Sequence, residues 1–149
     1  DDISQIYVNQ GPGNFSGLRG SLAVAKGVSI SKNIKLFGYD NFIWACSKFL
    51  NKKKTIYSLI KFRDKYFLKI FDENLINSTN KIEEVTENEI LQKYDKVFKV
   101  ISKNEIKLFN EKILKLDNLN IVDLDHNELE LLQLNGLLDE DLIKPVYLS

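Results

Sequence analysis

The stretch that decides the fold is QIYVNQGPGNFSGLRGSLAVAKGVSISKNIKLFG, residues 5 to 38. Its first five residues, Gln5 to Asn9, are rich in the aromatic and β-branched side chains that favour strands. A glycine-rich turn then leads into a helix expected from Ser16 to Ser31, and a second strand is expected from Lys35 to Gly38. A strand, a helix and a strand in this order predict an α/β protein in which the two strands pair in parallel.

The glycine-rich turn has two interpretations. Glycine at positions 11 and 13 permits positive φ, while Asn14 or Ser16 can cap the following helix. In one interpretation the free amides hold an anion, and the candidate residues are Gly11, Gly13, Asn14, Ser16 and Gly17. In the other the glycines only let the chain reverse. The segment has no Gly-Lys-Ser/Thr sequence of the Walker type, so its spacing does not choose between them.

The helix after the turn has two apolar faces. At a helical period, small residues form one face, Gly20, Ala23, Val24 and Gly27, and larger ones form the opposite face, Leu18, Leu22 and Ala25. A surface helix normally has a single apolar stripe, so this one is expected to be covered by a sheet and also by a second helix, from this chain or from a partner. A fully buried central helix is the alternative. The candidate partner-binding residues are Leu18, Arg19, Gly20, Ala23, Val24, Lys26 and Gly27.

Composition excludes several classes of protein. The 149 residues are 44% hydrophobic, which is enough for a real core, and 21 basic residues balance 21 acidic ones, so no overall basic excess predicts nucleic-acid binding. The single cysteine, Cys46, excludes a disulfide framework and is expected to be buried. No apolar run has the length of a membrane span, and a cytoplasmic location is expected.

The remainder of the chain alternates strands and helices. The lysine-rich segment 51–54 indicates a boundary, so we expect one lobe over residues 1–51 and a second over 52–149. The expected elements are a helix at Asn41–Leu50, a hairpin of strands Thr55–Phe62 and Tyr66–Phe71, a helix at Glu87–Tyr94, strands at Lys96–Ile101 and Asn120–Leu124, and a helix at Asn127–Asn135 ended by Gly136. Residues 103–119 show no clear pattern.

Candidate catalytic groups are scarce. The one histidine, His126, lies among acidic residues, but a single imidazole without a second ligand at helical spacing is a weak metal signal. The acidic run at 139–141 lacks the spacing of a calcium loop. Ser16 has no histidine base near it in the sequence. We therefore expect no catalytic residue and no metal.

Four segments resemble the TsaB (YeaZ-type) family. Residues 11–19, GPGNFSGLR, are similar to the family signature Gly-Pro-Gly-Ser-Phe-Thr-Gly-Leu-Arg. Residues 25–27 and 34–38, AKG and IKLFG, also fit, and Pro145 to Leu148 is similar to the Pro-x-Tyr-Leu-Arg ending. The similarity is strongest over residues 5 to 45 and weakest from about 73 to 143.

The resemblance implies an actin-like, two-lobed ASKHA (ribonuclease H-like) fold and a role in forming threonylcarbamoyladenosine on tRNA next to the anticodon. In that system TsaB is the noncatalytic scaffold of its paralogue TsaD, and TsaE is the associated ATPase. The implied partners are therefore TsaD, TsaE and a possible second copy of this chain, with tRNA bound only through the complex. No cofactor is implied for this chain, and ATP or ADP belongs to the complex.

The resemblance also distinguishes the two paralogues. TsaD has a His-x-x-x-His metal pair after its second strand, whereas this chain has Asn41 and Ala45 at those positions, and neither replaces imidazole. Lys61 stands where the family often has Asp, and Ser149 replaces the terminal Arg. The family's leading strand hairpin and first helix have no counterpart here, so we expect an N-terminally truncated chain with an incomplete first lobe. A nucleotide-binding enzyme that uses the glycine turn as a phosphate cradle remains the alternative, and a general α/β interaction module is a third possibility.

Overall fold

The computed structural model describes residues 4–13, 15–77, 79 and 81–148. It divides into two compact units, the first formed by Asp1–Trp44 with His126–Ser149 and the second by Ala45–Asp125. This division differs from the expected lobes 1–51 and 52–149, because the C-terminal segment returns to the first unit. Each unit has its own sheet, and we describe them separately.

The first unit contains the predicted strand–helix–strand segment. Strand β1 (Gln5–Asn9) pairs in parallel with β2 (Lys35–Tyr39), with Tyr7 opposite Phe37, and helix α1 (Phe15–Lys32) connects them. The predicted parallel pair is therefore confirmed, and α1 has nearly the predicted bounds.

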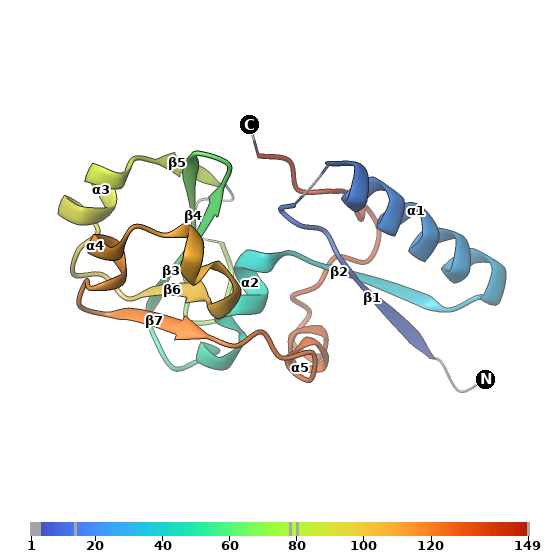
Figure 1. Cartoon of the computed structure of the whole chain (residues 1–149). Coiled ribbons are helices and arrows are strands. Elements are labelled where there is room, and N and C mark those ends of the chain that lie inside the picture. Colours follow the sequence, from blue (N-terminus) through green and yellow to red (C-terminus); the bar gives the residue numbers. More distant parts are fainter. Residues whose placement is uncertain (1–3, 14, 78, 80, 149) are drawn as a thin grey trace. The chain divides into compact units, whose positions relative to one another are not determined.

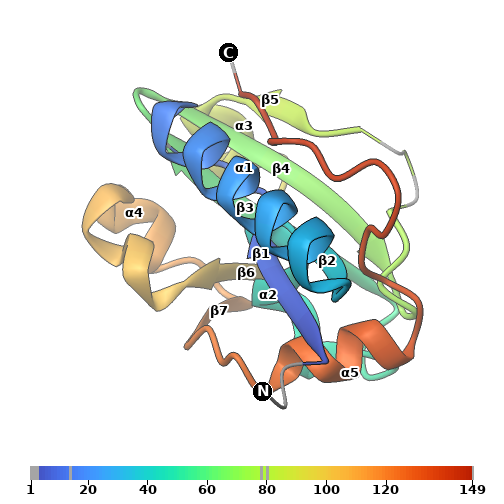
Figure 2. The same ribbon diagram turned by 90° about the vertical axis from the view of Figure 1, so that its right-hand side faces the viewer.

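Two helices cover the two faces of this strand pair. Helix α1 lies over one face and α5 (Glu128–Leu134) over the other, as Figures 1 and 2 show. Under α1, four buried side chains form a cluster: Val8, Leu22, Ala25 and Ile143. The side chains of β1 alternate between the faces, so Tyr7 points away from α1 toward α5.

A closed ring of hydrogen bonds holds α5 to β1. The Gln5 amide donates to the Tyr7 hydroxyl at 2.6 Å, the hydroxyl donates to Gln133 Oε1, and the Gln133 amide donates back to Gln5 Oε1 at 3.1 Å. Burial and then the charge of Glu130 raise the pKa of Tyr7, which keeps the hydroxyl protonated as a donor.

The C-terminal segment is bonded to the first sheet by backbone and side chain. Gly38 and Asp139 form an antiparallel bridge, and the Val146 amide donates to the Gln10 carbonyl at 2.7 Å. The buried Gln10 amide donates to Asp139 Oδ2 at 3.1 Å and to the Lys144 carbonyl at 3.0 Å. These bonds between residues far apart in sequence are the physical reason that 126–149 belongs to the first unit.

The helix expected at Asn41–Leu50 is shorter in the structure. Helix α2 spans Asn41–Cys46 and is followed by the 3-10 turn η1 (Ser47–Phe49). Cys46 is buried and free, as predicted.

The second unit is built on a five-stranded mixed sheet in the order β5-β4-β3-β6-β7. Its strands are β3 (Thr55–Phe62), β4 (Lys65–Asp72), β5 (Glu83–Val85), β6 (Lys99–Ser102) and β7 (Leu119–Val122). The predicted hairpin of β3 and β4 is confirmed by their antiparallel register, whereas β5 was not predicted. The remaining elements are α3 (Glu87–Gln92), η2 (Lys103–Leu108) and α4 (Glu111–Leu114).

The core of the second unit contains large apolar side chains from both sheet and helices. Leu59 and Ile101 from the sheet pack with Ile90 of α3 and Ile113 of α4. A lysine, Lys99, is also fully buried, with 0% exposure. No helix in the described part of the chain is both long and apolar enough to cross a bilayer.

The buried ammonium of Lys99 is held in this unit by hydrogen bonds to backbone carbonyls. Its ammonium donates to the carbonyls of Tyr94 at 2.8 Å, Asp95 at 2.8 Å, Val97 at 2.9 Å and Asp117 at 3.1 Å. Burial lowers the pKa of Lys99, opposed by the charges of Asp95 and Asp117. The carbonyls of Tyr94, Asp95 and Val97 turn to this ammonium, the segment is a bend, and β6 begins at Lys99 rather than at Lys96.

Candidate functional site

The outward face of α1 is the main candidate for a binding surface. Gly20, Ala23, Val24 and Gly27, which the sequence placed on one face, are all exposed. Val24 is 68% exposed and Ile30, farther along the same side of the helix, 82%. A Cβ placed on Gly20 or Gly27 would have no neighbour within 4 Å. The described part of the chain therefore leaves this face uncovered.

An open groove of about 580 Å³ borders this face where α1 overhangs the outer edge of β1. Its lining is mostly apolar or small: Ile6, Tyr7, Val8, Gly20, Ser21, Val24, Ala25 and Val28. No described strand pairs with that edge of β1, since β1 and β2 form a two-stranded sheet. The groove extends the apolar surface of α1 down to the sheet.

The other predicted contact residues divide between this face and the interior. Arg19 and Lys26 are exposed and flank the small face. Leu18 is partly buried, and its methyl groups lie where a Cβ on Gly11 would be, 2.7 Å from one of them. Leu18 therefore packs under the glycine turn instead of belonging to the outward face.

The glycine turn is tied together by its own hydrogen bonds. Gly11 has φ +97°, as predicted for a turn that needs glycine, and its N–H donates to Asn9 Oδ1 at 2.7 Å. The Asn41 backbone amide donates to the Gly11 carbonyl at 2.8 Å, and its side-chain amide donates to the Pro12 carbonyl at 3.1 Å. Asn9 Nδ2 in turn donates to Asn41 Oδ1 at 2.9 Å. The Gly11 amide is thus already used within the protein.

A hollow of about 430 Å³ lies over this turn, lined in part by Gly13 and Gly17. Asn14 and the side chain of Ser16 lie outside the described part of the chain. The structure therefore places three predicted anion-site residues, Gly11, Gly13 and Gly17, around one hollow, with the Gly11 N–H turned to Asn9.

Several of the groups considered for catalysis contact other parts of the first unit. The Asn41 side chain stabilises the glycine turn, and Ala45 is buried. His126 is exposed, and its ring contacts that of Trp44 with centroids 5.0 Å apart. Asp139, in the acidic run 139–141, accepts from Gln10. Within the described residues no group of three His, Cys, Asp or Glu could hold a metal ion.

One carboxyl in the second unit has a shifted pKa that no sequence pattern predicted. Glu105, in η2, lies beside β3, and its Oε1 accepts from the Lys61 backbone N–H at 2.9 Å. Burial raises the pKa of Glu105 to about 7, partly offset by that hydrogen bond. The Lys61 ammonium does not pair with it but lies 5.3 Å from the centre of the Tyr66 ring. The pairing of Lys61 with Glu105 joins residues far apart in sequence, so no local pattern reveals it.

Comparison with solved structures finds two similar chains from Pseudomonas aeruginosa. One is described as an uncharacterized protein with similarity to peptidase YEAZ, and it matches 98% of this chain and 74% of its own length, with a TM-score of 0.61 at 12% identity. The other, described as YeaZ, matches 97% of this chain and 74% of its own length, with the same TM-score and identity. No family profile and no curated protein sequence matches the chain. The chain therefore has the fold of the YeaZ structures, as its resemblance to the TsaB (YeaZ-type) family predicted.

Proposed function

We propose that this protein is a noncatalytic scaffold that binds a TsaD-type paralogue in the complex that forms threonylcarbamoyladenosine on tRNA. In this proposal the paralogue carries the metal and the chemistry, a TsaE-type ATPase associates with the complex, and ATP or ADP acts there. The fold is that of an actin-like ASKHA protein whose first lobe is represented by β1, α1 and β2. The similarity to the YeaZ structures and the resemblance over residues 5 to 45 support it.

The observation that carries the proposal is the uncovered outward face of α1. Glycine in a helix interior costs up to about 1 kcal/mol relative to alanine. Gly20 and Gly27 bring this cost, yet no described neighbour approaches them. Small residues on a helix surface let another backbone approach closely, and an apolar patch of this kind on a soluble protein indicates a protein interface. A helix of a partner fits this surface best.

The same surface could also join two copies of this chain. A homodimer through α1 is the arrangement expected when the paralogue is absent, because the exposed apolar side chains Val24 and Ile30 remain in water otherwise. The paralogue and the second copy would then compete for one face.

The test is to place a bulky charge on this face of the protein. We expect Ala23→Arg and Gly27→Arg each to weaken binding of the TsaD-type paralogue at least about 100-fold, since a buried unpaired charge costs several kcal/mol. Isothermal titration calorimetry with the purified paralogue measures the loss.

The control is Asn88→Arg, which adds the same side chain at an exposed position of α3 in the second unit. This variant should bind as the wild type does. If Ala23→Arg and Gly27→Arg fold, as judged by circular dichroism, and still bind normally, α1 is not the interface and the proposal fails.

The alternative function, a nucleotide-binding enzyme, has less support from the geometry of the glycine turn. The Gly11 N–H, which a phosphate cradle would direct at its ligand, donates to Asn9. In the described part of the chain no acidic or metal-binding cluster accompanies the turn.

A further inference from the structure

Four lysines lie close together in the segment that leads into β3. Lys48, Lys52, Lys53 and Lys54 fall within seven consecutive residues, 48–54, which we call the basic loop. The surrounding sequence from Asn41 to Arg63 contains neither aspartate nor glutamate. A chain whose overall charge is balanced therefore has one segment whose charge is strongly positive.

The lysines of the basic loop are exposed and unneutralised. All four are exposed. In the part of the chain that the structure describes, none of them forms an ion pair with a carboxylate. The nearest acidic residue identified by a hydrogen bond is Glu73, whose carbonyl accepts from the Asn51 N–H at 2.7 Å. Adjacent like charges repel one another, and a polyanion relieves that repulsion.

The backbone of the basic loop is held in a defined place, although its lysines form no ion pairs with carboxylates among the described residues. Asn51 has φ +62° and is fixed by its bond to Glu73, and the Lys52 N–H donates to the Phe49 carbonyl at 2.9 Å. The Lys53 ammonium lies 4.9 Å from the centre of the Phe98 ring, which in turn contacts Phe49 with centroids 4.9 Å apart. An aromatic pair thus supports Lys53.

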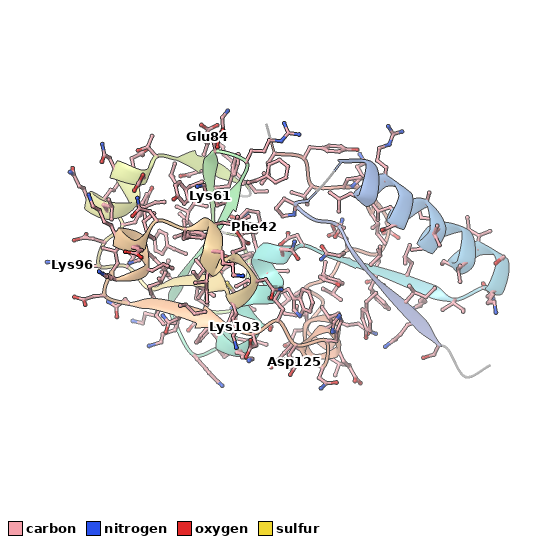
Figure 3. The ribbon with its side chains drawn as sticks, in the orientation of Figure 1. Phe42, Lys61, Glu84, Lys96, Lys103 and Asp125 are labelled. Carbon is pink, nitrogen blue, oxygen red and sulfur yellow. The ribbon has the colours of Figure 1, made fainter. Side chains whose placement is uncertain are left out.

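We propose that the basic loop binds the phosphate backbone of RNA. Lysine ammonium groups on flexible stems make point contacts with phosphates without reading sequence. The half-buried Phe98 ring beneath the Lys53 ammonium places an aromatic group among the lysines, a combination also found in single-stranded nucleic-acid grooves. Lys96, which extends into solvent in Figure 3, is a further exposed lysine two residues before Phe98.

Two other anionic partners fit the loop less well. A membrane surface takes up apolar side chains as well as lysines, and the large exposed hydrophobic residues of the described chain all lie outside residues 45–60 and 94–100. An acidic protein would be bound best through the planar fork of arginine and a buried apolar centre, and the basic loop has neither.

This inference goes beyond the proposed function, in which tRNA is bound only through the complex. It assigns a direct RNA contact to the second unit of this chain, whereas the proposed partner face is on α1 of the first unit. The isolated full chain tests it without the paralogue, so its failure leaves the scaffold proposal untouched.

The experiment measures fluorescence anisotropy of a fluorescein-labelled single-stranded RNA of mixed sequence. Four phosphate contacts predict a slope of log affinity against log salt of about −3, which is a loss of about 50-fold between about 50 and 200 mM salt. The triple variant Lys52→Gln, Lys53→Gln, Lys54→Gln should bind at least about tenfold more weakly at the lower salt, with a slope smaller in magnitude by about two.

The matched control removes the same charge elsewhere, as Lys81→Gln, Lys107→Gln, Lys144→Gln, all exposed positions outside the loop. It should keep the wild-type affinity and slope. The proposal is overturned if the wild type does not bind RNA, if both triple variants lose affinity equally, or if the chain binds phosphatidylserine vesicles through this loop and not RNA. Because every substituted lysine is exposed, the variants are expected to fold, and circular dichroism verifies this.

Discussion

The protonation of the Glu105 carboxyl is linked to the stability of the second unit. Its pKa of about 7 in the folded protein lies above the value of about 4.3 in an unfolded chain. The folded state therefore binds more protons than the unfolded state between these values. The stabilisation from this group is complete below the unfolded pKa and is lost as pH rises through about 7.

We expect Glu105→Gln to stabilise the second unit at pH 8 by up to about 3 kcal/mol and to have little effect below about pH 4.5. Glutamine keeps the Oε1 that accepts from the Lys61 N–H but cannot ionise, so only the desolvation cost of the charge disappears. Urea denaturation at several pH values measures the difference. Glu111→Gln, at an exposed position of α4, is the control. Equal stability of wild type and Glu105→Gln at pH 8 would show that the carboxyl is not buried.

The sequence predicted the conformation of residues that depend only on their neighbours along the chain. Gly11 and Gly136 have the positive φ expected of a turn glycine and of a helix-terminating glycine, at +97° and +69°. The burial and hydrogen bonds of Glu105 and Lys99 were not predicted, because their partners are brought to them by the tertiary structure. Lys99 lies in a lysine-rich sequence, and only the fold brings the carbonyl of Asp117 to it.

At the scale of elements, a glycine in β2 and a glycine in α1 differ in the space that a side chain would find. A Cβ on Gly38 of β2 would lie 2.7 Å from Gln10 Cδ and 2.8 Å from Ile143 Cγ2. Gln10 cannot move aside easily, since it is buried and bonded to Asp139 and Lys144. On α1, Gly20 has open space above it.

The same substitution should therefore have opposite effects at these two positions. Gly38→Ala is expected to destabilise the first unit by about 1 to 3 kcal/mol through overpacking. Gly20→Ala should stabilise it by up to about 1 kcal/mol, because alanine favours the helix. Thermal unfolding followed by circular dichroism compares the two variants. A stabilising Gly38→Ala would mean that the C-terminal segment does not pack on β2.

Long periodic elements were predictable, whereas the short elements β5 and α4 were not. The alternation in β3 and β4 and the helical pattern of α1 extend over many residues. Strand β5 has only three residues, two of them glutamate, and it exists because β4 offers it an edge. Helix α4 has four residues, which is too few for a periodic signal.

At the scale of the whole molecule, the two units differ in how well their backbone bonds are protected. The first has a two-stranded parallel sheet whose outer edge on β1 pairs with no strand among the described residues, and the second has a five-stranded sheet in which β3 is paired on both sides. Parallel sheets are normally buried on all sides, and two-stranded ones are marginal. The first unit should therefore open more often.

We expect amides of β1 and α1 to exchange with deuterium faster than those of β3 and β4. Hydrogen exchange with mass spectrometry on the full chain resolves these segments by peptide. Binding of a partner to α1 should slow exchange in the first unit by mass action and leave β3 unchanged. Equal protection of β1 and β3 in the free chain would contradict the expectation.

The assignment of segments to units needed the structure. Sequence placed a boundary at the lysines 51–54, whereas the chain passes between units at Trp44–Ala45 and returns at Asp125–His126. The return depends on backbone bonds such as that of Val146 to Gln10, which no local composition shows.

The ring contact between Trp44 and His126 has a practical consequence. These are the single tryptophan and the single histidine of the chain, and both belong to the first unit. Trp44 is 7% exposed, and its ring also meets that of Tyr39 at 5.1 Å. Emission excited selectively at the indole therefore comes from the first unit alone. The protein thus has a built-in optical label that distinguishes the unfolding of this unit from that of the other without any added dye.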